Sequence, residues 1–489
     1  MIGEVPCTVE RTPLLAPDPE RVLARLFVPG QSGFVAEESR SSAVLRRIAA
    51  LSDDEVDRSL ADVFERTGAR HRDLRGTFLD HFGEVADRVA AGTVSSDARQ
   101  LLVGAAFTCE YALEGAALCN PSIVAHPEQD GADGLKFVMS VRAIGEGHIS
   151  SIGFRTGVVD ATGAVALDEP PHFASCGVEE PALLDLTVFR RELDRVGASS
   201  ESAEFVLDPL GQWFTGGQLE VQLARLERHR TTRSGARETI TLLRAIAERS
   251  YGVRFSEAIP LGERVLWPVI DAERNGMEDA RFVRFEDDGA PATYFATYTA
   301  YDGATISQQL LATTDFTSFT SSPLVGPAAA NKGLALFPRR IGGRYAALSR
   351  ADRETNAIAF SDNPRAWGTA TPIQLPTRPW ELLQLGNCGS PIETPAGWLV
   401  LTHGVGPMRT YSIGAILLDL DDPTRVIGHL REPLLAPAAD ERDGYVPNVV
   451  YSCGALVHGG VLVVPFGICD GAIGVATVPL DEMLATMGA

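Results

Sequence analysis

The segment NGMEDARF (275–282) brings two carboxylates and a guanidinium close together in the chain. On a strand, side chains alternate between two faces, so Asp279 and Arg281 should share one face while Glu278 points the other way. An arginine beside an aspartate keeps that aspartate ionised, whereas a general acid needs a raised pKa. Burial or a second carboxylate would have to raise it, and a surface ion pair is the alternative interpretation.

The segment NKGLALFPRRIGGRYAALSR (331–350) is basic although the whole chain is acidic. Lys332 and Arg350 lie near its two ends, with further arginines between them. The chain carries 43 basic and 64 acidic residues, a net charge of −21, so an anionic ligand must be held by a local cluster of this kind. Lys332 is also one of only two lysines in the chain. We therefore predict an anion site here, with a solvated strand face as the alternative.

Three more stretches place polar side chains directly beside apparent strands. They are 140–157, 386–411 and 441–474. The candidate residues in them are Arg142, Glu146, His148, Arg155, Asn387, His403, Arg409, Tyr411, Glu441, Asp443, Asn448 and Asp470.

These residue types fit two related reactions. Two well-separated carboxylates, one acid and one base, serve glycoside hydrolysis with inversion. One carboxylate beside an anion pocket serves phosphorolysis, in which phosphate replaces water. The residues alone leave both open. The chain has no GxxxxGK[ST] phosphate loop, and its nine histidines show neither HxH nor HExxH spacing, so we predict no metal site and no cofactor.

The elements that must position these residues change in character along the chain. Residues 1–105 are expected to be mainly helical after a loop-like start, and 106–489 to form the catalytic domain. Short apolar or alternating runs predict strands from about residue 118, interrupted by a helical insertion at about 176–250. The strand segments recur every 40–60 residues in five units, which is typical of propeller blades. A pair of packed β-sheets is the alternative.

Composition excludes several classes of protein. The chain has 489 residues, of which 45% are hydrophobic and 22% charged, as in globular proteins. Its acidic balance argues against nucleic acid or an anionic membrane as the main partner. It has no apolar run of transmembrane length and no signal-peptide pattern. The seven scattered cysteines form no CxxC pair, so we expect reduced thiols and a cytoplasmic location.

Several of these motifs, in this order, resemble those of glycoside hydrolase family 130. The matching strings include NGMEDARF, NKGLALFPRRI, GNCGSPIETPAGWLVLTHGV, GYVPNVVYSCG and PFGICDGAIGVAT, and they cover about 118–175 and 260–480. The resemblance implies a five-bladed β-propeller that cleaves β-mannosides with inversion, either as a phosphorylase or as a β-mannosidase. The two helical regions lie outside the short family core, so the chain resembles a longer member.

The resemblance also implies roles for individual residues. Asp279 matches the catalytic acid, which in the phosphorylases acts through the mannosyl 3-hydroxyl. Asp470 matches an aspartate near the donor sugar, and His403 matches a histidine that contacts phosphate. Two departures weaken the match. Ala280 replaces the usual proline, and Gln384 stands where the phosphorylases often carry a lysine.

We predict an inverting β-mannoside phosphorylase that yields α-mannose 1-phosphate, with a β-mannosidase or a non-catalytic sugar-binding propeller as alternatives. The expected ligands are a β-mannoside oligosaccharide and inorganic phosphate, and a homo-oligomer is possible. Asp279 is the predicted acid, and Glu441 or Asp443 is the predicted base if water replaces phosphate. The predicted phosphate-binding residues are Lys332, Arg350, His403 and Arg409. The predicted sugar-binding residues are Arg142, Glu278, Arg281, Asn331, Asn387, Tyr411, Asn448 and Asp470.

Overall fold

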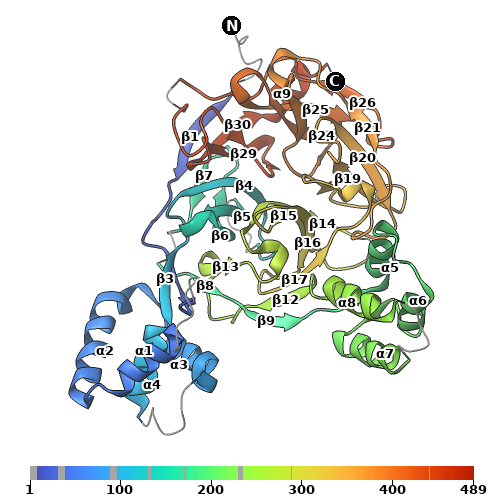
Figure 1. Ribbon diagram of the computed structural model, residues 1–489. Helices are drawn as coiled ribbons and strands as arrows, with labels where there is room; N and C mark the ends of the chain where they lie inside the picture. Colours follow the sequence, from blue (N-terminus) through green and yellow to red (C-terminus); the bar gives the residue numbers. More distant parts are fainter. Residues whose placement is uncertain are drawn as a thin grey trace. The chain divides into compact units, whose positions relative to one another are not determined.

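The computed structural model describes residues 8–30, 39–88, 96–129, 134–169, 172–229, 235–287, 289–439 and 441–488 (Figure 1). The chain divides into two compact units. The smaller one consists of Asp18–Gly115 with a short segment at Pro171–Ser175, and the larger one contains the rest. The secondary structure is mainly β, as predicted, and the predicted propeller is taken up under Proposed function. No helix in the described ranges is both long and apolar enough to cross a membrane.

The smaller unit is a helical bundle with one two-stranded sheet. Its helices are α1 (Arg40–Ala49), α2 (Asp53–Thr67), α3 (Leu74–Val85) and α4 (Asp97–Ala106), and strand β2 (Val22–Leu26) pairs with β3 (Thr108–Ala112). The helices begin at side-chain caps, because an oxygen of Ser39, Ser52, Asp73 or Ser96 accepts a hydrogen bond from a free backbone N–H of the first turn. Their apolar faces meet in one core around Leu60, Phe78 and Leu101.

The start of the chain differs from the expected loop. Strand β1 (Glu10–Leu15) pairs antiparallel with β30 (Ala472–Pro479), close to the other end of the chain. Sequence periodicity could not predict this pairing, because a short strand acquires its partner only through the fold. The domain boundary predicted at residue 105 stays a prediction.

The larger unit contains five groups of antiparallel strands, numbered here 1 to 5 along the chain. Group 1 comprises β4 (Ala117–Ala125), β5 (Leu135–Ile144), β6 (Ser150–Val159) and β7 (Val165–Leu167). Group 2 comprises β14 (Gly276–Phe285), β15 (Thr293–Tyr301), β16 (Ile306–Thr313) and β17 (Ser318–Pro323). Group 3 comprises β18 (Ala335–Leu336), β19 (Tyr345–Ser349), β20 (Asn356–Ser361) and β21 (Thr371–Gln374).

Groups 4 and 5 complete the series. Group 4 comprises β22 (Gln384–Asn387), β23 (Ile392–Thr394), β24 (Gly397–Val405), β25 (Tyr411–Leu418) and β26 (Val426–His429). Group 5 comprises β27 (Val450–Tyr451), β28 (Leu456–His458), β29 (Val461–Ile468) and β30, with β1 at its edge. Strands β4 and β24 are buried on both faces, because they pack against neighbouring elements on both sides.

The predicted helical insertion is present between groups 1 and 2. It consists of α5 (Leu186–Arg195), α6 (Glu201–Leu207), α7 (Gly216–Arg228) and α8 (Ala236–Ala247), which lie together in Figure 1. The helices share one apolar core, which continues onto Val325 and Ala366 of the strand region. Strand β12 (Tyr251–Arg254) follows the insertion and pairs with both β9 (Val178–Pro181) and β17.

Candidate active site

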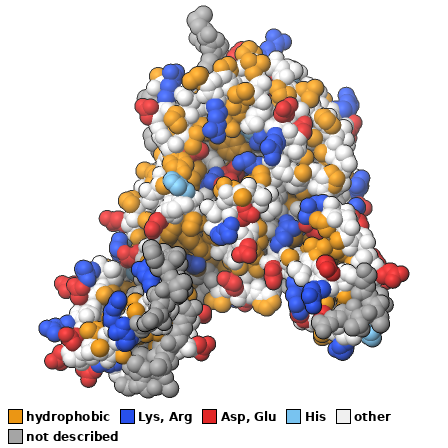
Figure 2. Space-filling view, in the orientation of Figure 1, with side chains coloured by type: hydrophobic (Ala, Val, Ile, Leu, Met, Phe, Trp, Pro, Cys, Tyr) orange, Lys and Arg blue, Asp and Glu red, His pale blue; other side chains and the backbone are white. Residues whose placement is uncertain are grey.

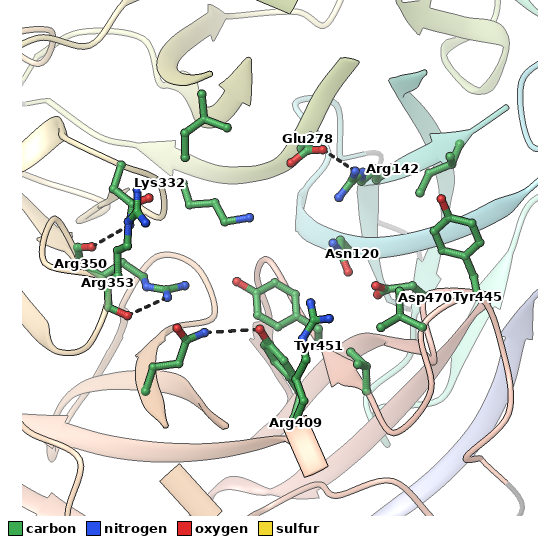
Figure 3. Close-up of a pocket in the computed structure, with 17 residues that line it drawn as sticks. Asn120, Arg142, Glu278, Lys332, Arg350, Arg353, Arg409, Tyr445, Tyr451 and Asp470 are labelled. Atoms are coloured by element: carbon green, nitrogen blue, oxygen red, sulfur yellow. Dashed lines mark hydrogen bonds and ion pairs between the residues drawn. The ribbon is translucent and has the colours of Figure 1, made fainter. Parts of the chain in front are cut away.

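A cavity of about 550 Å³ in the larger unit collects side chains from all five strand groups (Figure 3). Figure 2 shows acidic and basic side chains gathered in a hollow of the molecular surface. The polar residues that line the cavity are Asn120, Arg142, Glu278, Asn331, Lys332, Arg350, Arg353, Gln384, Arg409, Tyr411, Tyr445, Tyr451 and Asp470. Segments that lie hundreds of residues apart in the sequence therefore build one site.

The predicted alternation of Glu278 and Asp279 is wrong, because strand β14 is bulged at this point. Its register with β15 shifts between Glu278 and Arg281, and Asp279 has φ of 57°. The bulge brings both carboxylates to one guanidinium. Arg142 donates to Glu278 Oε1 at 2.6 Å and to Asp279 Oδ1 at 3.1 Å.

Asp279 is only 5% exposed and lies directly behind the cavity lining, where it contacts the lining residues Asn120 and Arg142. Its Oδ1 accepts from Asn120 Nδ2 at 2.6 Å as well as from Arg142, and no described residue hydrogen bonds to its Oδ2. Burial alone would raise the pKa of Asp279, but the charges of Arg142, Lys332 and Arg281 outweigh burial and hold that pKa well below its ordinary value. Without a ligand, Asp279 is therefore a carboxylate.

A second carboxylate in the cavity holds its proton more tightly. Burial, and then the negative charge of Asp279, raise the pKa of Asp470 to about 6. Asp470 lines the cavity in group 5, whereas Asp279 belongs to group 2. The two groups thus have opposite shifts, so below about pH 6 the proton that this pair holds resides on Asp470 rather than on Asp279.

Four basic side chains line the cavity without an acidic partner. Among the described residues, no ion pair is formed by Lys332, Arg350, Arg353 or Arg409. By contrast, Arg142, Arg339 and Arg340 are each paired with a carboxylate. In Figure 3, Lys332, Arg350 and Arg353 lie on one side of the cavity and Asp470 lies on the other. Arg409 lies between these two sides in the same view. These four residues, called here the basic wall, can bind an anion with several charge-assisted hydrogen bonds.

Arg350 is held in place by residues behind this wall. Its Nη1 donates to His403 Nε2 at 3.2 Å, and its Nη2 donates to the Arg353 carbonyl at 3.1 Å. His403 Nδ1 in turn donates to the Asn387 carbonyl at 3.1 Å, which fixes the ring in one tautomer. Burial, and then the charges of Arg350 and Arg281, hold the pKa of His403 well below its ordinary value. A neutral His403 can therefore accept from Arg350 and orient its guanidinium.

Comparison with known proteins identifies the family to which this chain belongs. Residues 234–488 match the model of a glycoside hydrolase family described as β-1,4-mannooligosaccharide phosphorylase. The chain belongs to glycoside hydrolase family 130. The family predicted from the sequence motifs is thereby confirmed.

Two curated relatives of this family 130 chain match over part of their length. A 1,2-β-oligomannan phosphorylase of Thermoanaerobacter sp. (strain X514) is 40% identical over 155 residues, which cover 31% of this chain and 52% of the relative. A β-1,2-mannobiose phosphorylase of Listeria innocua is 33% identical over 228 residues, which cover 45% of this chain and 62% of the relative. The matched part of the chain thus spans about half to three-fifths of these two proteins.

Solved structures of similar proteins were also found. The β-1,2-mannobiose phosphorylase from Listeria innocua, in complex with β-1,2-mannobiose, has a TM-score of 0.46 and 21% sequence identity to this chain. The match covers 77% of this chain and 93% of that protein.

Seven of the residues predicted for the family 130 site lie outside the cavity lining. Asp279 lies beside the lining residues Asn120 and Arg142, and His403 lies behind Arg350. Asn387 and Arg281 are buried behind the lining, where Asn387 donates to the Gly333 carbonyl and Arg281 donates to Tyr451 Oη. The backbone carbonyl of Asn448 accepts a hydrogen bond from the Tyr411 N–H. Glu441 accepts from Arg11 at 2.8 Å, and Asp443 is exposed. None of the seven is among the residues that line the cavity.

Sequence reasoning missed Asn120, Arg353, Tyr445 and Tyr451, which all line the cavity. Two of them, Asn120 and Arg353, share a left-handed backbone conformation with other residues of the candidate site. Each strand group supplies a non-glycine residue with φ between 48° and 72°, and these residues are Asn120, Asp279, Asn331, Arg353, Arg409 and Asp470. Such strain persists only where the surrounding structure enforces it, and it gathers at functional sites. An asparagine inside the apolar run ALCNPSIVA was the one visible signal for Asn120.

We expect Gly386→Ala to weaken anion binding. A Cβ at this position would lie 2.6 Å from His403 Cε1 and 2.7 Å from Arg350 Cδ, and both side chains are fixed. Overpacking of this size costs about 1–3 kcal/mol, so the KM for phosphate should rise about tenfold as Arg350 moves. The measurement is the phosphate KM beside the melting temperature. Gly368→Ala is the matched control, because nothing lies within 4 Å of its Cβ, and an equal effect there would contradict the interpretation.

We expect Asp470→Asn to stabilise the fold above pH 6 while it impairs the site. The folded-state pKa of about 6 exceeds the ordinary value near 4, so the native state loses stability as pH rises from about 4 to about 6, and the loss is complete above pH 6. Asparagine avoids that cost, which amounts to about 3 kcal/mol at pH 8 and vanishes below pH 4. Thermal unfolding of both proteins at pH 4, 6 and 8 measures the difference. A difference that is constant over this range would contradict it.

Proposed function

We propose that this chain phosphorolyses β-mannosides with inversion and yields α-mannose 1-phosphate. We further propose that its five strand groups are the blades of a β-propeller. The support for the propeller is that five consecutive groups of antiparallel strands contribute side chains to one cavity, although groups 1 and 2 are joined by a single parallel pair between Ser150 of β6 and Gly276 of β14. Strand β1 adds to the last group, so the two ends of the chain meet in one blade and hold the ring closed.

The basic wall carries the proposal of phosphorolysis. In a chain with a net charge of −21, four basic side chains without acidic partners among the described residues line one cavity. Unpaired cations at close range repel one another, so their gathering implies an anionic ligand that neutralises them. A phosphate dianion offers oxygen acceptors for Lys332 and for planar guanidinium groups.

The site also supports the acid–base part of the reaction. A phosphate oxygen attacks C1 of the mannosyl group from the α face, while the β-glycosidic bond breaks and its oxygen takes a proton from Asp279. The proton passes through the mannosyl 3-hydroxyl in the arrangement that the family resemblance implies. The proton carried by the attacking hydrogen phosphate returns to Asp279, so the overall reaction neither consumes nor releases a proton.

This mechanism requires Asp279 to be protonated before the bond breaks. In the ligand-free site its proton is disfavoured by Arg142, Lys332 and Arg281. A phosphate dianion on the basic wall opposes the charge of Lys332 and thereby raises the pKa of Asp279. Asp470, with a pKa of about 6, supplies a second carboxyl that holds a proton below about pH 6. Phosphate binding thus favours the protonated form of Asp279, which the reaction requires.

Hydrolysis is less well supported by the geometry. The predicted bases were Glu441 and Asp443, but neither lines the cavity, and Glu441 is paired with Arg11. One observation favours hydrolysis. Gln384, which stands where the phosphorylases often carry a lysine, is an uncharged residue of the lining and donates to Tyr411 Oη at 3.3 Å. A β-mannosidase is therefore kept as the alternative.

The experiment incubates the purified chain with β-1,2- and β-1,4-mannobiose, with and without inorganic phosphate, and separates the products. Phosphorolysis predicts consumption of disaccharide only when phosphate is present, with equal amounts of mannose 1-phosphate and mannose. Phosphate-independent release of mannose would support the β-mannosidase. Binding without turnover would support a non-catalytic sugar-binding propeller.

A further inference from the structure

The cavity wall opposite the basic wall carries an aromatic residue that the proposed mechanism does not use. Tyr445 lines the cavity and is 43% exposed. In Figure 3 it lies beside Asp470, across the cavity from Lys332, Arg350 and Arg353. An exposed aromatic ring in a cavity lined largely by polar groups offers a flat apolar surface to a ligand.

The backbone on both sides of Tyr445 is held by contacts with Cys469, which precedes Asp470 in group 5. The backbone N–H of Val446 donates to the carbonyl of Cys469 at 2.9 Å, next to Asp470. A Cβ at Gly444 would lie 2.5 Å from the Cβ of Cys469, so the two backbones approach each other closely. The position of Tyr445 is therefore tied to the position of Asp470.

Tyr445 is also anchored from the side, by the turn between β5 and β6 in group 1. Tyr445 Oη lies 2.8 Å from His148 Nδ1, and the two ring centroids are 5.9 Å apart. The turn presents His148 through left-handed conformations at Gly147 and His148, with φ of 66° and 59°. This contact joins groups 1 and 5 and leaves the orientation of the Tyr445 ring defined before any ligand binds.

The geometry of an inverting reaction indicates which part of the substrate lies against the wall that carries Tyr445. In an inverting displacement the nucleophile and the leaving group lie on opposite sides of the reacting carbon. If phosphate occupies the basic wall, the departing sugar must lie toward the other side, where Tyr445 is. A pyranose ring has an apolar face of C–H groups that can pack on an aromatic ring.

We propose that Tyr445, oriented by His148, is the platform on which the leaving sugar of the substrate rests. This inference rests on the proposed function, because it takes the basic wall as the phosphate site. Tyr445 is then a binding residue for the acceptor hexose in the reverse reaction, and His148 is a positioning residue that acts through Tyr445.

The test measures synthesis from α-mannose 1-phosphate with mannose as the acceptor. For Tyr445→Ala we expect the acceptor KM to rise about tenfold, while the phosphate KM in the forward direction stays within about twofold. Tyr445→Phe keeps the ring and should raise the acceptor KM only about two- to threefold, and His148→Ala should do the same. The matched control is Trp213→Ala, an aromatic residue of similar exposure (46%) that does not line the cavity.

Three results would overturn the inference. An acceptor KM that is unchanged in Tyr445→Ala would exclude the platform, and an equal rise of the phosphate KM would place phosphate on this wall. Equal losses in all three variants, together with a lower melting temperature, would show that the contact only holds the two loops together.

Failure of the proposed function gives a different result, because it appears in the wild-type chain. If the wild type does not use phosphate, calorimetric titration with β-1,2-mannobiose replaces the kinetic assay. A platform then predicts about tenfold weaker binding in Tyr445→Ala and near-normal binding in Tyr445→Phe.

Discussion

The Asp279→Asn variant is expected to lose kcat/KM for a β-mannoside by about 10²–10⁴-fold, because it removes the general acid. Asparagine keeps an oxygen for the hydrogen bonds from Asn120 and Arg142, so the fold should survive. Initial rates at saturating phosphate, with circular dichroism to verify folding, measure the effect.

Glu278→Gln is the matched control for this variant. Glu278 is the neighbouring carboxylate on the same guanidinium, at 2.6 Å from Arg142, but it is not the proposed acid. Its loss should lower kcat/KM by much less than the loss of Asp279. A leaving group with a low pKa needs little protonation, so 4-nitrophenyl β-mannoside should restore part of the rate in Asp279→Asn only. Equal losses in the two variants would mean that Asp279 serves only the ion-pair network.

The Arg350→Ala variant is expected to raise the phosphate KM about 10- to 100-fold. Arg350 is 6% exposed and carries no acidic partner, so its charge is directed to the ligand. A hydrogen bond to a charged group contributes about 1.5–3 kcal/mol, which corresponds to this range. The measurement is the phosphate KM at saturating mannobiose, together with the mannobiose KM at saturating phosphate.

Arg350→Lys separates charge from geometry. Lysine keeps the positive charge but lacks the second donor arm, so it cannot contact both His403 and the Arg353 carbonyl as the guanidinium does. We expect an intermediate phosphate KM. If Arg350→Ala left the phosphate KM unchanged and raised only the mannobiose KM, the basic wall would be a sugar site and not an anion site.

Sequence patterns predicted the mainly β region, the helical insertion and much of the site. The predicted site residues that line the cavity are Arg142, Glu278, Asn331, Lys332, Arg350, Arg409, Tyr411 and Asp470. The sequence could indicate these residues because alternation and turn residues are local signals, and because a basic cluster in an acidic chain stands out. Their roles in the reaction stay predictions.

The remaining features depend on contacts that the sequence does not display. The bulge at Asp279 reverses the expected facing of its side chain, since a shift by one residue moves a side chain to the other face. His403 was expected to contact phosphate, but it lies behind Arg350, a placement that depends on Gly386 lacking a side chain. Arg353 reaches the cavity from a strained turn, and no propensity favours arginine with φ of 72°.

The most direct test of the central claim is the partition of the mannosyl group between phosphate and water. The reaction with β-1,2-mannobiose at saturating phosphate is followed by ³¹P and ¹³C NMR. The account predicts that every mannosyl group transferred appears as mannose 1-phosphate with the α configuration, matched by an equal loss of inorganic phosphate. Release of two mannose molecules for each disaccharide, with the inorganic phosphate signal unchanged, would contradict it.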